Sequence, residues 1–116
     1  MDAIAALEAA LHERSIPALP RVPRHEILAH KVACTADNET VVGVSLRTCG
    51  WTALPDALWE LTDLQVLALG EDPLTTLSAR LGNLKHLTHL YVYDSDVTTL
   101  PDSIGGLRKL VVLDLG

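Results

Sequence analysis

The sequence predicts an α/β repeat fold in which strands from successive copies of one block stack into a solenoid with a parallel concave sheet. An apolar pattern begins at Leu61, again at Leu84 and again at Leu107, a constant step of 23 residues. Read backwards by the same step, the apolar positions of the first block fall on apolar residues between positions 41 and 58. Self-similarity at a fixed period of this length is typical of a solenoid.

Within each block the spacing predicts one strand and one short convex segment. Residues 66–70 alternate large apolar side chains with other residues, which is the period of a strand with one buried face. Pro55 and Pro101 each precede a short apolar segment and suit the first turn of a brief 3-10 or helical piece. One block cannot bury its apolar face alone, so we expect neighbouring blocks to cover one another.

These blocks resemble leucine-rich repeats of the intracellular, Shoc-2-like and disease-resistance-like kind. The similarity covers residues 41–116 and includes the segment Leu-Pro-Asp-Ser-Ile-Gly-Gly-Leu at 100–107. The departures lie at the usual asparagine position, which holds Cys49, Asp72 and Ser95, and at Ser78, where the other copies have proline. The resemblance implies a module that binds another protein through its concave sheet.

Residues 1–40 are interpreted as an N-terminal cap and residues 41–116 as about three repeats, the last incomplete. Residues 2–13 predict a helix, with Leu7 and Leu11 on one face, that covers the end of the repeat core; a membrane or partner helix is the alternative. The prolines at 17, 20 and 23 favour an extended connection over a polyproline-type ligand. A hairpin follows, with arms at 31–34 and 40–46. It is similar to part of the plant-type repeat cap, without that cap's disulfide.

Composition and charge exclude several classes of protein. The chain has 48% hydrophobic residues, 21% charged residues and a net charge of −6. Neither the cap nor the repeats show a basic patch in sequence, so we expect no nucleic-acid or membrane partner. Two cysteines do not make a disulfide scaffold, and the acidic start is unlike a secretory signal. These features predict a cytoplasmic protein.

No catalytic or cofactor motif is found in the sequence, so we expect no enzyme activity and no cofactor. Of the five histidines only His86 and His89 are close, and on a strand approach their side chains should diverge, which disfavours a metal site. Cys34 and Cys49 are better interpreted as a buried thiol and a backbone-bonding thiol than as a catalytic pair. Asp94 and Asp96 resemble only a fragment of a calcium loop.

The candidate site is the concave face. If the leucines point inward, their neighbours point onto the opposite face of the sheet, where both tyrosines gather with a histidine. Aromatic residues with a polar tip are enriched where interfaces concentrate their energy. The predicted protein-binding residues are Arg47, Glu71, His89, Tyr91, Tyr93 and Asp94. The alternative is that the tyrosines only cover a strand.

Two further features bear on partners. Trp59 occupies the position of Gly82 and Gly105, and we expect the N-terminal helix to cover it; an exposed indole that serves a partner is the alternative. Nothing in the sequence covers the last strand. The predicted function is therefore non-catalytic protein recognition in signalling or host interaction. The alternatives are the substrate-recognition segment of a ubiquitin ligase or kinase, and a unit that self-associates through its C-terminal edge.

Overall fold

The computed structural model describes residues 7–9, 21–29, 32–37, 40–47, 54–71, 73–93, 95–97 and 99–114, and within these ranges the chain forms five strands and four 3-10 helices. Residues 7–9 are helical. The other elements are η1 (Arg24–Ala29), β1 (Val32–Asp37), β2 (Thr40–Arg47), η2 (Asp56–Glu60), β3 (Val66–Gly70), η3 (Ala79–Asn83), β4 (His89–Tyr93), η4 (Asp102–Gly106) and β5 (Val112–Asp114).

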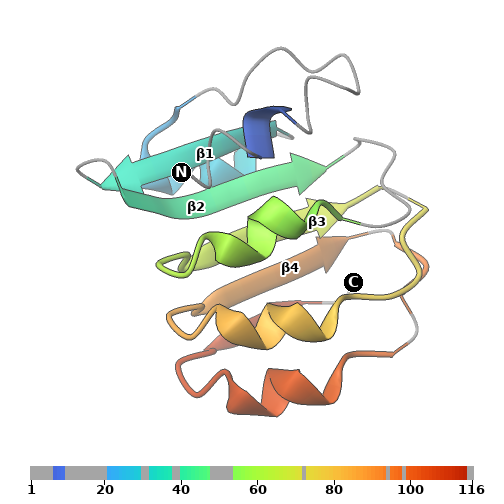
Figure 1. Cartoon of the computed structure of the whole chain (residues 1–116). Helices are drawn as coiled ribbons and strands as arrows, with labels where there is room; N and C mark the ends of the chain where they lie inside the picture. The colour runs from blue at the N-terminus through green and yellow to red at the C-terminus, as the bar shows by residue number, and fades with distance from the viewer. Residues whose placement is uncertain are drawn as a thin grey trace.

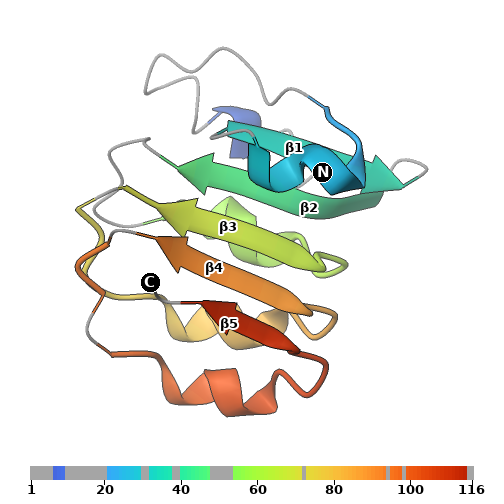
Figure 2. The same cartoon turned by 180° about the vertical axis from the view of Figure 1, so that it is seen from behind.

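The strands form one open sheet in the order β1-β2-β3-β4-β5. β1 and β2 form the antiparallel hairpin predicted from the sequence, but the first arm runs on to Asp37 instead of ending at residue 34. The remaining pairs are parallel. η2, η3 and η4 lie one below the other on one face of the sheet (Figure 1). η1 lies on the opposite face, across β1 and β2 (Figure 2). The protein is therefore a small α/β domain with a mostly parallel sheet. The expected boundary between the cap and the repeats, between residues 40 and 41, falls at the hairpin and stays a prediction.

The repeat step sets the register of the parallel strands. Leu67 pairs with Leu90, and Leu90 pairs with Leu113, so residues 23 positions apart stand side by side. Leu67 and Leu90 are fully buried in the main hydrophobic cluster. Leu113, on the last strand, is 42% exposed, because no further strand covers it in the described structure. The register places the three leucines in one row, which is dry at Leu67 and Leu90 but not at Leu113.

The 3-10 helices η2, η3 and η4 begin after the same backbone conformation, although the residues at this position differ. Pro55, Ser78 and Pro101 have φ between −67° and −64° and ψ between 141° and 148°. Proline imposes such a φ through its ring. Ser78 has no ring, but its hydroxyl accepts a hydrogen bond from the backbone N–H of Arg80 at 3.1 Å, which is an N-cap. The serine thus replaces a covalent restraint by a hydrogen bond.

Trp59 belongs to the core. Its side chain is 1% exposed and lies in the main cluster, so the alternative of an exposed indole is wrong. Leu7, in the described turn of the N-terminal helix, is fully buried in the same cluster, while Leu11 lies outside the described residues. The N-terminal segment therefore contributes to the core that contains Trp59.

Gly70 ends β3 where no other residue fits. Its φ is +148°, and a Cβ placed there would lie 2.3 Å from the carbonyl oxygen of Tyr93 on β4. Glu71 follows with φ 57°, and its backbone N–H donates to that same carbonyl at 2.9 Å.

In the part of the chain that the structure describes, no helix is both long and apolar enough to cross a membrane.

Gly70→Ala is expected to lower the free energy of unfolding by about 2–4 kcal/mol, because the new methyl group clashes with backbone and the φ is strained. Gly105→Ala is the matched control, since no atom lies within 4 Å of a Cβ at that position. It should change stability by less than about 1 kcal/mol. Urea unfolding followed by circular dichroism measures both; equal losses would contradict the close approach at Gly70.

Deleting residues 1–15 is expected to shift the fluorescence of Trp59 to the red, because the deletion removes Leu7 from the cluster that buries the indole. Trp51→Phe is made first, so that Trp59 is the only emitter. Circular dichroism should show that the sheet persists. An emission maximum unchanged by the deletion in a folded protein would count against this packing.

Candidate protein-binding face

The sheet face opposite η2–η4 has a regular grid of side chains, which we call the tyrosine face. Its rows follow from the pairing of β2, β3, β4 and β5. They read Gly43, Val66, His89, Val112; then Ser45, Ala68, Tyr91, Asp114; then Arg47, Gly70, Tyr93. The register matches the predicted concave face.

Much of this face is already covered within the chain. Every residue of β3 is buried, and so are Gly43 and Ser45 on β2. A second, smaller hydrophobic cluster lies here, consisting of Ile27, Ala33 and Val66 with Val22 and Tyr91 packed against it. The accessible part of the tyrosine face therefore lies over β4, β5 and the end of β2.

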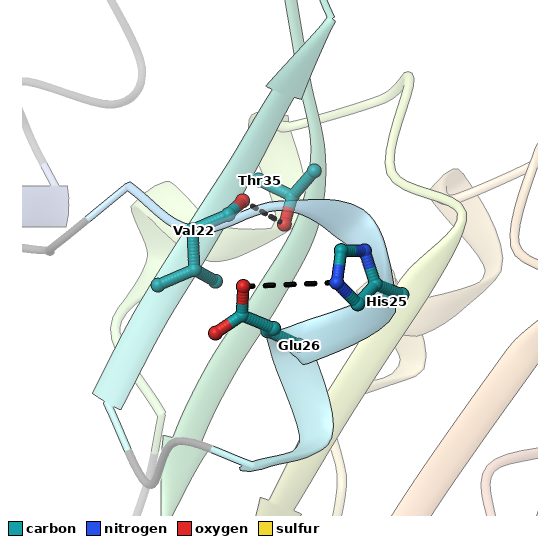
Figure 3. Close-up of polar contacts among 4 residues, drawn as sticks. All are labelled: Val22, His25, Glu26 and Thr35. Atoms are coloured by element: carbon teal, nitrogen blue, oxygen red, sulfur yellow. Dashed lines mark hydrogen bonds and ion pairs between the residues drawn. The ribbon is translucent and has the colours of Figure 1, made fainter.

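The cover over β1 and β2 is the segment that contains η1. Ile27 is 3% exposed, and its Cγ1 lies 3.6 Å from the point where Gly43 would have a Cβ. Two hydrogen bonds hold the entry to η1: the N–H of Val22 donates to the carbonyl of Cys34 at 2.9 Å, and the Thr35 hydroxyl donates to the Val22 carbonyl at 2.8 Å (Figure 3). The small residue at position 43 leaves the room that Ile27 fills.

His89, Tyr91 and Tyr93 form a ladder of rings along β4. The ring centroids of His89 and Tyr91 are 6.2 Å apart at an interplanar angle of 21°, and those of Tyr91 and Tyr93 are 5.6 Å apart at 26°. Alternate residues of a strand share a face about 7 Å apart, so the rings need only a small tilt to stack. All three side chains are half-buried, which leaves part of each ring accessible.

Arg47 extends the ladder across the sheet. It lies on β2 and Tyr93 on β4, with Gly70 paired to both. Because Gly70 has no side chain, the two long side chains meet above it, with the guanidinium carbon of Arg47 5.5 Å from the centroid of the Tyr93 ring. A cation–π contact at such a partly exposed site contributes about 0.5–1 kcal/mol.

The orientation of His89 is fixed by its neighbour. The Thr88 hydroxyl donates its single proton to the Gln65 carbonyl at 3.0 Å. The contact of 2.8 Å between the Thr88 oxygen and His89 Nδ1 must then use a proton on Nδ1. The neutral imidazole therefore has its acceptor at Nε2. His86 contacts Lys109, so the two histidines have different hydrogen-bond partners.

Of the two acidic residues of the predicted site, the structure describes Glu71. Glu71 is half-buried beside Tyr93, to which its backbone is bonded. Asp94 lies outside the described residues. Asp114, which the site prediction did not include, is exposed and pairs with Tyr91 across the β4–β5 ladder. The alternation of β5 already placed Asp114 on this face, so the signal was present in the sequence.

Tyr93 keeps its proton more firmly than a free tyrosine. Burial raises the pKa of its hydroxyl above the usual 10.0, Tyr91 and the negative charge of Asp114 raise this pKa further, and the positive charge of Arg47 lowers it. At neutral pH the group is therefore a neutral hydroxyl that can donate a hydrogen bond. Such a group suits recognition of a partner.

Cys34 shows no sign of a reactive thiol. It is 2% exposed in the main cluster, and burial raises the pKa of the thiol; Arg21 lowers this pKa and Glu8 raises it. A thiol that stays protonated is a poor nucleophile. Cys49 lies outside the described residues. Within the described ranges, no three His, Cys, Asp or Glu side chains gather closely enough to hold a metal ion.

Comparison with known proteins finds short similarities to much longer chains. No family model matches the sequence. It is 33% identical over 66 residues to adenylate cyclase of Schizosaccharomyces pombe. It is 42% identical over 59 residues to the CCR4-Not complex 3'-5'-exoribonuclease subunit Ccr4 of Kluyveromyces lactis. These stretches are 56% and 51% of this chain but only 4% and 7% of those two proteins.

Tyr91→Phe leaves Tyr93 as the only tyrosine, so phenolate absorbance against pH reports its ionisation. We expect a pKa above 10.0, because burial, the largest cause of the shift, remains. In this background Arg47→Gln should raise the pKa further, and Asp114→Asn should lower it.

The same shift affects stability. The folded state holds the Tyr93 proton more tightly than the unfolded chain, so this contribution is complete below pH 10 and is lost as the pH rises through the folded pKa. In the Tyr93→Phe variant, the free energy of unfolding should no longer show this decrease at high pH. A pKa at or below that of the urea-unfolded protein would refute the assignment.

Proposed function

We propose that the chain is a leucine-rich-repeat module. The proposal is supported by the constant 23-residue step, which puts Leu67, Leu90 and Leu113 in one row across parallel strands. It is also supported by the 3-10 helices of successive blocks, which begin in one backbone conformation on the convex side. On this interpretation residues 41–116 form a solenoid and the preceding residues its N-terminal cap.

Its function is non-catalytic recognition of another protein through the tyrosine face. The main observation is the ladder of half-buried rings that ends in the Arg47–Tyr93 contact. Rings that are already ordered lose little conformational entropy on binding, and tyrosine and arginine are enriched among residues that dominate binding energy. His89 adds an acceptor and Glu71 a carboxylate to the contact surface. Asp94, predicted from the sequence to belong to it, lies outside the described residues. Tyr91 also packs against the second cluster, so covering β3 is part of its role.

The two similar proteins support a binding role. Their names state different activities, a cyclase and an exoribonuclease, yet each shares a stretch with this chain. Similarity to proteins with such different activities is better explained by an interaction than by either reaction. By resemblance to intracellular repeats, the setting is signalling or host interaction in the cytoplasm.

A second candidate is the substrate-recognition segment of a larger enzyme, such as a ubiquitin ligase or kinase. The observation in its favour is that both similar proteins are enzymes by name and that the matched stretch is a small part of each. In this case the tyrosine face would bind the protein substrate, and the chemistry would belong to another part of the protein.

A third candidate is self-association through β5. Val111 is 78% exposed and Leu113 is 42% exposed, whereas Leu90, which holds the position of Leu113 one block earlier, is fully buried. A second copy could cover this edge. Light scattering distinguishes the cases, since a monomer at high concentration excludes this candidate.

A pull-down from a matched cell lysate, with the full chain immobilised, tests the proposal. Tyr93→Ala and Arg47→Ala are each expected to weaken binding of the specific partner by about 2 kcal/mol, roughly thirtyfold in Kd. Asp102→Ala, an exposed change on η4 at the opposite face, is the control and should leave binding intact. Equal capture by wild type and Tyr93→Ala, with the fold verified by circular dichroism, would refute recognition through this face.

A further inference from the structure

The turns that lead into β4 and β5 bring four basic residues together. We call Lys85, His86, Arg108 and Lys109 the basic edge. The same turn occurs twice: the N–H of Lys85 donates to the Asn83 carbonyl, and the N–H of Arg108 donates to the Gly106 carbonyl, each at 3.0 Å. These turns lie one below the other at the left of Figure 1, and all four side chains are exposed. The pairs 85–86 and 108–109 are one repeat step apart, so stacking makes them neighbours.

Contacts between the two turns confirm that they form one surface. Lys109 Nζ lies 3.2 Å from His86 Nδ1. Lys85 Nζ lies 3.3 Å from the point where Gly106 would have a Cβ, so the missing side chain at Gly106 leaves room for the ammonium group. A side chain from each turn therefore contacts the other turn, which brings Lys85 and Lys109 to one surface.

This concentration of positive charge lies in an acidic protein. The chain has 15 acidic residues against 9 Lys and Arg, yet three of those nine lie on the basic edge. Across the described ranges, no carboxylate lies within ion-pair distance of Lys85, Arg108 or Lys109. The patch ends at Asp63, which holds the position of His86 in the preceding block.

The hydrogen-bonding character of the edge is equally one-sided. Ammonium and guanidinium groups are donors only. Since Lys109 has no acceptor, it donates to His86 Nδ1, and the neutral ring then has its proton on Nε2. The four side chains thus offer N–H donors, and their one acceptor is already used. A ligand that fits must supply acceptors with negative charge.

We propose that the basic edge binds an acidic protein segment, a run of aspartate or glutamate carboxylates. Adjacent strands are about 4.8 Å apart, so the two turns make a short contact that suits a few carboxylates. A long polyanion such as nucleic acid would also meet Asp63 and the net charge of −6, which oppose it. The basic edge adjoins the His89 end of the tyrosine face but consists of different residues. It therefore adds a second contact surface to the proposed function.

The test uses the full chain and a fluorescently labelled oligo-glutamate peptide, with binding measured by anisotropy. Non-specific electrostatics oppose this complex because both molecules are acidic, so binding reports the local patch. We expect Lys109→Gln to weaken binding about threefold and Lys85→Gln with Lys109→Gln about tenfold. Arg80→Gln removes the same charge at an exposed position on η3 and should leave the affinity unchanged.

Three outcomes would overturn the proposal: no binding of oligo-glutamate by the wild type, equal affinity of wild type and double variant, or tighter binding of a single-stranded oligonucleotide than of oligo-glutamate. The Tyr93→Ala variant should bind oligo-glutamate with wild-type affinity. This result separates the basic edge from the tyrosine face, because either proposal can then fail without affecting the test of the other.

Discussion

The rest of the structure depends on one constraint, the mutual burial of leucines that stand 23 residues apart. Leu67 and Leu90 are fully buried because a strand lies on each side of them, while Leu113 at the edge remains 42% exposed. Burial of such a side chain contributes about 1.5–3 kcal/mol, and the contribution requires both neighbours. The register of the sheet, the stacking of the 3-10 helices and the alignment of the turns all follow from this step.

The tyrosine face is shaped by the strand with the smallest side chains on that face. Ala68 and Gly70 on β3 leave space that Tyr91 and Tyr93 cover from one side and Arg47 from the other. Gly70 acts twice, because its backbone approaches β4 too closely for a Cβ and its missing side chain lets Arg47 reach Tyr93. The ordered surface therefore depends on residues that are themselves buried.

The same stacking also separates charge. Residues at equal positions in successive blocks become neighbours, so the pairs Lys85-His86 and Arg108-Lys109 accumulate at the start of the strands, while Asp114 lies toward their end. A net charge counted along the chain does not register this arrangement, which is why the sequence indicated no basic patch. Aligning the blocks before counting charges would have found it.

The sequence by itself determined the strands of the repeats, the register of their leucines, the 3-10 helices that follow Pro55 and Pro101, and the side of the sheet on which the tyrosines lie. These features are periodic, and a period along the chain becomes a direction in space once the blocks stack. Only the tertiary structure decided that Ile27 covers Gly43, that Tyr91 shares in a second cluster and that Arg47 meets Tyr93. The segment with η1 belongs to no repeat, and the Arg47–Tyr93 contact joins residues two strands apart. Contacts of this kind depend on the volume left by other side chains, for which a linear pattern has no signal.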